Sequence, residues 1–124
     1  MPQERPMVTK LDLRQLLLAW QSGEITTVDY YKKVSDYHGN YDRPDDNEAV
    51  NEFLGELEMG DVNLLIKDDI PALLDILEQV TSSQDCDLRF KQLYTTYDAY
   101  ERAKALVDEE PYAPAARSMT KRAI

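Results

Sequence analysis

The chain has 124 residues, with 24 acidic residues against 14 basic ones and a formal net charge of −10. This length suits one domain that folds without metal or disulfide, and Cys86, the sole cysteine, has no partner for an internal disulfide. The acidic balance argues against nucleic-acid binding, which needs clustered Lys and Arg. Without a secretory signal or a run of 18 apolar residues, we expect a soluble cytoplasmic protein that does not contact membranes.

The first predicted helix begins after residue 11 and ends before Gly23. Its apolar residues recur at helical spacing: Leu13, Leu16, Leu17 and Trp20. Asp12 is expected to cap the start, and Gly23 is expected to end the helix in the left-handed conformation that glycine adopts without strain.

A second helix is predicted to start at Thr26 or Thr27, either of which can cap a first turn. Its inward stripe is expected to be Val28, Tyr31 and Val34, and Gly39-Asn40 closes it. His38, the sole histidine, falls at the end of this helix, where a positive charge is favourable beside exposed carbonyls. We interpret His38 in this way rather than as a catalytic residue.

The third predicted helix follows a polar loop around Pro44, ends at Gly60 and has the clearest apolar face in the chain. That face consists of Ala49, Val50, Phe53, Leu54 and Leu57. Leu64–Ile66 is expected to be helical or an irregular buried link. A fourth helix is predicted at Asp68-Asp69-Ile70-Pro71, because Asp caps free amides and Pro is tolerated in a first turn.

One last long helix is predicted from Ser82-Ser83 to Leu106, with a bend at Thr95-Thr96. Pro111 and Pro114 are expected to end regular structure, so residues 111–124 would form a mobile tail after a single helical domain of residues 1–110. Because the connections are short, successive helices should be antiparallel neighbours. The predicted fold is all-α, a compact antiparallel bundle of four to six helices.

The negative charge is concentrated between residues 42 and 87. This segment contains fourteen acidic residues and only two basic ones, Arg43 and Lys67. Within the third helix, Glu48, Glu52 and Glu56 follow one another at four-residue spacing with no basic residue between them. Such a row repels itself in an isolated helix, so a cationic partner could neutralise it. The alternative is a solvated face that keeps the protein soluble.

The segment Leu16–Thr26, with the sequence LLLAWQSGEIT, resembles the opening of a family of small uncharacterised bacterial proteins. Asp45–Val50, Val62–Leu64 and Asp69–Leu73 continue the likeness, which spans roughly residues 12 to 78. This resemblance implies a shared fold rather than an activity.

Residues 13–34 are also similar to the start of the colicin-D-type immunity proteins, through a helix, a turn, Ile25-Thr26 and a second amphipathic helix. Proteins of that family are small acidic helical bundles that plug the positively charged active site of a tRNA-cleaving toxin. The resemblance therefore implies an inhibitor that acts by occlusion.

We predict an acidic inhibitor, an immunity protein that occludes the basic active site of a nuclease-type bacterial toxin, without enzymatic activity, cofactor or metal. The expected partner-binding residues are Tyr41, Asp42, Asp45, Asp46, Glu48, Glu52 and Glu56. The alternative is a regulatory or scaffold module that docks a partner helix through Tyr and Leu side chains. An enzyme is disfavoured, because phosphate loops, Cys/His metal spacings and nucleophile elbows are missing from the sequence and Asp85 and Asp87 discourage a Cys86 thiolate.

Overall fold

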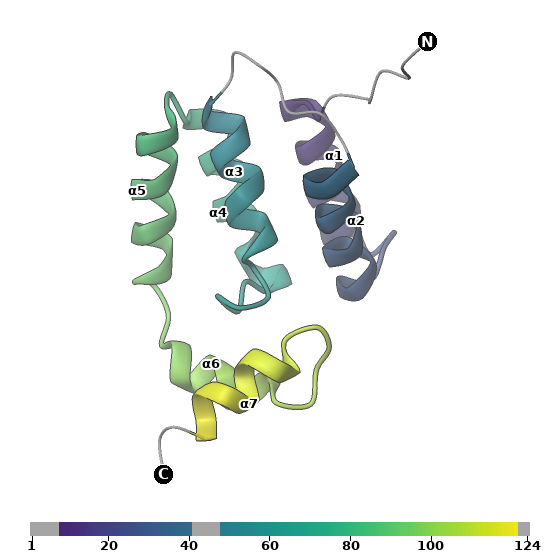
Figure 1. Cartoon of the computed structure of the whole chain (residues 1–124), viewed down its shortest axis with the longest axis vertical. Coiled ribbons are helices and arrows are strands. Elements are labelled where there is room, and N and C mark those ends of the chain that lie inside the picture. Colours follow the sequence, from purple (N-terminus) through teal and green to yellow (C-terminus); the bar gives the residue numbers. More distant parts are fainter. Residues whose placement is uncertain (1–7, 41–47, 122–124) are drawn as a thin grey trace.

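A computed structural model describes residues 8–40 and 48–121, and throughout these ranges the regular structure is helical (Figure 1). The elements are α1 (Lys10–Ser22), α2 (Thr27–Asn40), α3 (Glu48–Glu58), the 3₁₀ turn η1 (Lys67–Asp69), α4 (Ile70–Gln79), α5 (Ser83–Tyr94), α6 (Ala99–Leu106) and α7 (Ala113–Lys121). The all-α prediction is confirmed. The described residues form seven α-helices, more than the four to six expected.

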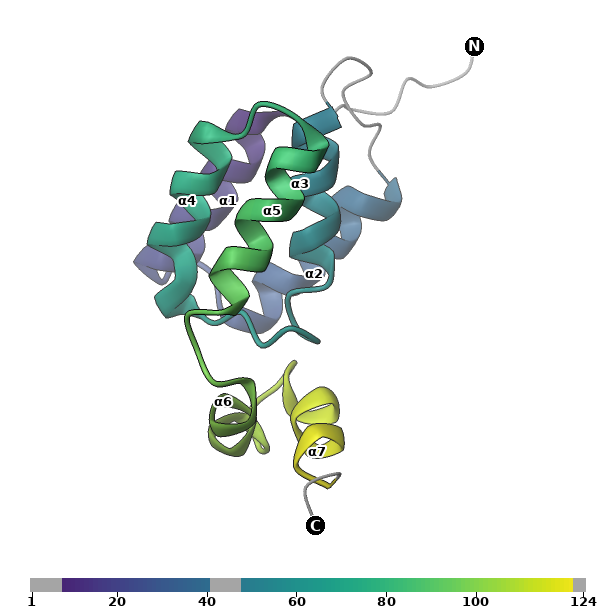
Figure 2. The same cartoon turned by 90° about the vertical axis from the view of Figure 1, so that its left-hand side faces the viewer.

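Helices α1–α5 lie side by side as a bundle, and α6 and α7 cross one end of it as a helical hairpin (Figures 1 and 2). Within the bundle, α3 packs against both α2 and α5, while α1 packs against α2 and α4. A single apolar cluster runs through both parts, with Trp20, Phe53 and Phe90 among its largest buried side chains. The compact bundle was thus predicted correctly for five of the helices.

The start of α1 lies one turn earlier than predicted. Thr9, not Asp12, is the N-cap: its Oγ1 accepts from the Asp12 amide at 3.2 Å, and the Asp12 carboxylate accepts from the Thr9 amide at 2.9 Å. This reciprocal pair is a capping box, in which two free amides are satisfied together. Gly23 ends the helix at φ 84°, as predicted.

The inward face of α2 differs slightly from the predicted stripe. Thr26 is the cap, because its Oγ1 accepts from the Asp29 amide at 3.1 Å. Tyr30 is fully buried and stacks on Trp20 with ring centroids 3.9 Å apart, whereas Val28 is only partly buried. The stacked ring pair therefore takes the place in the core that was expected for Val28.

The link between α3 and α4 is irregular and buried, one of the two predicted alternatives. Leu64 and Leu65 have almost no exposed surface, and Leu64 has a left-handed backbone with φ 61°. Asp69 occupies the predicted N-cap position of α4, but its side chain does not cap this helix. Its carboxylate turns back to accept from the Ile66 amide at 2.8 Å instead of capping α4, which begins at Ile70.

The predicted long helix between residues 83 and 106 is divided into α5 and α6. The hydroxyls of Thr95 and Thr96 donate to the Gln92 and Leu93 carbonyls, each at 2.6 Å, and so satisfy the last turn of α5. Asp98 then caps α6 by accepting from the Glu101 amide at 3.1 Å. The expected bend is therefore a complete break in the helix.

The predicted irregular tail is also wrong for most of its length, since residues 113–121 form α7. Pro114 lies in the first turn of this helix, where its missing amide costs no hydrogen bond. Tyr112, Ala113 and Ala116 are buried, and the Arg117 Nε donates to the Val107 carbonyl at 2.9 Å.

Candidate functional site

The predicted partner-binding residues divide into two groups. Tyr41, Asp42, Asp45 and Asp46 lie outside the described residues. The other three, Glu48, Glu52 and Glu56, lie on α3 as expected.

The row on α3 is not the open surface that the sequence suggested. Glu48 is exposed, but Glu52 and Glu56 are partly buried because this flank of α3 faces α5. The Glu56 carboxylate accepts a hydrogen bond from the Tyr94 hydroxyl of α5 at 2.7 Å. Carboxylate oxygens of Glu52, Glu56 and Asp87 all lie within 4.8 Å of one another. We call these three residues the acidic cluster.

One lysine lies beside the acidic cluster. The Lys91 Nζ is 2.8 Å from the Asp87 carboxylate, which raises the lysine pKa, with a smaller contribution from Glu56. Within the described ranges, Glu48, Glu52 and Glu56 form no ion pair. The described basic residues therefore form no direct ion pair with the row, although Lys91 lies close enough to interact with Glu56.

Carboxylate oxygens are the ligands that Ca²⁺ and Mg²⁺ prefer, so the acidic cluster has the donor chemistry of a hard-cation site. Such ions take about six to eight oxygen ligands, and the cluster offers three residues, of which Asp87 already binds Lys91. We therefore treat the acidic cluster as a charged surface rather than a metal centre.

Cys86 lies in the core close to the acidic cluster. The pKa of its thiol is raised to about 12, mainly by burial. The negative charges of Glu52 and Glu56 contribute more to this increase than those of Asp85 and Asp87. The prediction that the thiolate is disfavoured is confirmed. Its main cause is burial, not the flanking aspartates.

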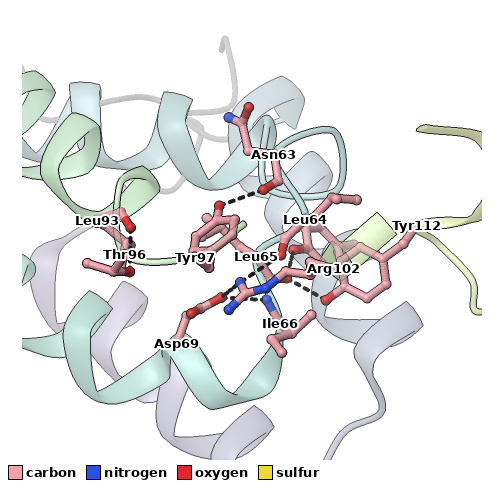
Figure 3. Close-up of polar contacts among 11 residues, drawn as sticks. Asn63, Leu64, Leu65, Ile66, Asp69, Leu93, Thr96, Tyr97, Arg102 and Tyr112 are labelled. Atoms are coloured by element: carbon pink, nitrogen blue, oxygen red, sulfur yellow. Dashed lines mark hydrogen bonds and ion pairs between the residues drawn. The ribbon is translucent and has the colours of Figure 1, made fainter. Parts of the chain in front are cut away.

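The most extensive polar network in the described structure joins the α6–α7 hairpin to the link before α4 (Figure 3). Three successive carbonyls, those of residues 63–65, each accept a hydrogen bond from this hairpin or its approach. Tyr97 Oη donates to the first at 2.7 Å, Arg102 Nη1 to the second at 3.1 Å, and Tyr112 Oη to the third. Tyr31 Oη, from α2, donates to the third carbonyl as well, at 2.6 Å.

An ion pair completes this network. Arg102 Nη1 lies 2.7 Å from the Asp69 carboxylate, and the two side chains are only 17% and 8% exposed. The guanidinium also lies over the Tyr97 ring, 3.6 Å from its centroid. We call Asp69, Tyr97, Arg102 and Tyr112, with the carbonyls of residues 63–65, the polar latch.

The chemistry of the polar latch is structural. Burial raises the pKa of Tyr97 to about 12 and raises those of Tyr31 and Tyr112 further, so these hydroxyls remain protonated donors. Sequence reasoning missed the latch because three of its acceptors are main-chain carbonyls, which any residue carries.

Two other features of the described residues lie on α2 and α7. His38 lies in the last turn of α2, as predicted. A surface depression near the end of α7 is lined by Pro114, Arg117, Ser118, Thr120 and Lys121. Among the described helices, none combines the length and apolar character needed to span a membrane.

No protein-family model, curated protein or solved structure matches this chain. The function is therefore argued from the arrangement of its own residues.

Proposed function

We propose that this protein is an acidic inhibitor of a basic protein partner, acting as an immunity protein that occludes the active site of a nuclease-type toxin. The observation that supports this proposal best is the charge balance along α3. Glu48, Glu52 and Glu56 receive no ion pair from the described part of the chain, and Lys91, which lies beside the acidic cluster, is bound to Asp87.

Occlusion would use the same chemistry that a nuclease uses to hold its substrate. The Lys and Arg side chains that bind phosphates would form charge-assisted hydrogen bonds with the carboxylates of α3 instead. A row of like charges repels itself in the free protein, and a cationic partner relieves that repulsion. Binding therefore removes an unfavourable interaction and adds favourable ones.

Partial burial would make Glu56 a more effective member of this surface. Its carboxylate is held by the Tyr94 hydroxyl, so less side-chain entropy is lost when a partner binds. A carboxylate beside the apolar body of the bundle is also screened less by water than a fully exposed one. Glu48, which is exposed at the start of α3, would extend the surface outward.

The test is a charge reversal at the two residues of the row that do not hold another element in place. Glu48→Lys with Glu52→Lys should reduce inhibition of the tRNA-cleaving domains of colicin-D-type toxins by at least about 100-fold, because attractive contacts become repulsive. The matched control is Glu24→Lys with Asp75→Lys, which changes the net charge equally at exposed positions away from α3.

Cleavage of tRNA with increasing inhibitor gives the readout, and circular dichroism verifies that both double variants are folded. The control should inhibit like the unmodified protein. The proposal would be refuted if the unmodified protein inhibited none of the tRNA-cleaving toxin domains tested. Equal inhibition by both double variants would also refute it.

One observation favours a second candidate, a module that docks an apolar partner helix. Leu11 and Leu18, seven residues apart and therefore on the same face of α1, are 60% and 40% exposed. Salt distinguishes the two candidates, because screening weakens binding through carboxylates but not binding through leucines.

A further inference from the structure

The α6–α7 hairpin is attached to the bundle in an unusual way. Its two helices pack extensively against each other, and neither packs comparably against any helix of the bundle. It is attached by the polar latch, by the Tyr112 ring, which meets the Tyr31 ring edge-on at a centroid distance of 5.6 Å, and by Leu106 and Ala116 in the shared apolar cluster. The hairpin is thus a separate packing unit held at a specific position.

The sequence of the connection to this hairpin is compatible with a continuous helix. Residues 95–98 contain neither Gly nor Pro, and the Thr95 backbone is already in the right-handed helical region at φ −83° and ψ −8°. The apolar spacing from Phe90 to Leu106 matches one uninterrupted helix, as the sequence predicts. Closing the break would therefore join α5 and α6 into a single straight helix.

Straightening this connection would carry the hairpin away from its own bundle. The carbonyls of residues 63–65, the Asp69 carboxylate and the Arg102 guanidinium would then lose their partners, which is costly for groups this buried. A second copy in the same open state presents the complementary groups in the same geometry. Each bundle could then receive the hairpin of the other copy.

We propose that two copies of this chain exchange their α6–α7 hairpins and form a symmetric dimer with two intermolecular polar latches. In this dimer, Arg102 of each copy pairs with Asp69 of the other, and α5 continues into α6. The partner is a second copy because the groups that the hairpin carries, the Arg102 guanidinium and the Tyr112 hydroxyl, match the Asp69 carboxylate and the carbonyls of residues 64 and 65. Tyr97 lies in the connection itself and is not needed for this match. Such exchange uses contacts that already exist in the monomer, so no new interface has to be created.

Charge-swapped variants test the exchange directly. Asp69→Arg places two cations in the latch, and Arg102→Asp places two carboxylates there, so each variant alone has a disrupted latch. When the two are mixed, an exchanged heterodimer contains one native Asp69–Arg102 pair and one inverted pair. A dimer that does not exchange hairpins restores neither pair.

We expect native mass spectrometry of the mixture to show a heterodimer at least about tenfold more abundant than either homodimer, because buried pairs broken in one chain are restored across two. Light scattering after gel filtration should give the dimer mass. A heterodimer only about twice as abundant as either homodimer, which is the ratio for random pairing, or monomers alone in the mixture, would overturn the proposal.

Two hinge variants provide a measurement that leaves the latch residues intact. Thr95→Ala with Thr96→Ala removes the hydroxyls that close α5 and raises helix propensity, so the dimer constant should increase about tenfold or more. Replacing both residues by Gly should lower it, because Gly disfavours a continuous helix. Concentrated mixtures of ¹⁴N- and ¹⁵N-labelled protein report whether dimers form, and absence of mixed-mass dimers in both the unmodified and the Ala protein would refute the exchange.

Discussion

Gly60 shows how a single missing side chain supports the centre of the molecule. A Cβ at this position would lie 2.9 Å from the Tyr31 hydroxyl and 3.0 Å from the Leu57 carbonyl. The Gly60 carbonyl also accepts from the Leu65 amide at 2.8 Å, so this residue cannot move away freely. Glycine is needed here for space, because the Tyr31 hydroxyl must pass it to reach the Leu65 carbonyl.

Replacing Gly60 by Ala should lower the free energy of unfolding by about 1–3 kcal/mol, the usual cost of overpacking a tight site. Urea denaturation measures the change. The matched control is Gly55→Ala in α3, where a Cβ meets nothing within 4 Å. That control should gain about 0.5–1 kcal/mol from helix propensity, and equal effects of the two substitutions would contradict the steric argument.

The buried Cys86 thiol should make the free energy of unfolding decrease as the pH becomes alkaline. Its thiol has a pKa of about 12 in the folded protein and an ordinary value of 9.0, so the native state binds this proton more tightly. The resulting stabilisation is fully present below about pH 9 and declines by up to about 1.4 kcal/mol per pH unit until the folded pKa is passed. Tyr97, whose pKa rises from 10.0 to about 12, acts in the same direction.

Urea unfolding between about pH 8 and pH 11 should therefore show decreasing stability, with a smaller decrease in Cys86→Ala. An identical pH profile for the Ala variant would exclude the thiol as a contributor.

At this scale the disfavoured thiolate was predictable from neighbouring charges. The dominant effect, burial, depends on the packing of α3 against α5, which the sequence around Cys86 does not specify.

At the scale of elements, the start of α1 shows how a cap can be assigned one turn too late. Asp12 is a good capping residue by type, but Thr9 with Asp12 three residues later makes the reciprocal arrangement. Thr9→Ala should cost about 1 kcal/mol, measured by thermal unfolding, because the Asp12 amide loses its acceptor. Thr9→Ser keeps the hydroxyl, so the stability that it loses should be less than about half of that lost by Thr9→Ala. Equal destabilisation by Ala and Ser would count against the hydrogen bond as the cause.

The two incorrect elements near the C-terminus have different physical causes. Proline in the sequence predicts an end to regular structure, yet Pro114 lies in the first turn of α7, since its fixed φ suits that position. The buried side of α7 includes Ala113 and Ala116, which are too small to give a visible apolar stripe. The break at residues 95–98 was missed for the opposite reason, since the apolar spacing continues through it.

At the scale of the whole molecule, the helical class was predictable because apolar periodicity is a local property of the sequence. The surroundings of the glutamate row could not be predicted from the sequence. One flank of α3 is covered because this helix packs against α5 as well as α2, and no residue on α3 itself identifies that second neighbour. The proposed binding role of the row remains a prediction.

The Asp69–Arg102 pair links the two packing units, and its loss should weaken the whole chain. Arg102→Met leaves a buried carboxylate without its cation and should cost about 3–5 kcal/mol in urea denaturation. Lys104→Met, on the same helix, removes an exposed pair with Glu101 and should cost less than about 1 kcal/mol. Adding Asp69→Asn to Arg102→Met should recover part of the loss, and no recovery would argue against an unpaired charge as the cause.

The limited packing between the hairpin and the bundle also determines how the backbone amides exchange with solvent deuterons. A unit with few helix–helix contacts to the bundle can detach while the remaining helices stay folded, so its protection reflects a partial opening of low free energy. Amides of α6 and α7 should therefore exchange together and earlier than those of α3 and α5, whose protection approaches that of global unfolding. The chain would then have two levels of cooperativity within one continuous core.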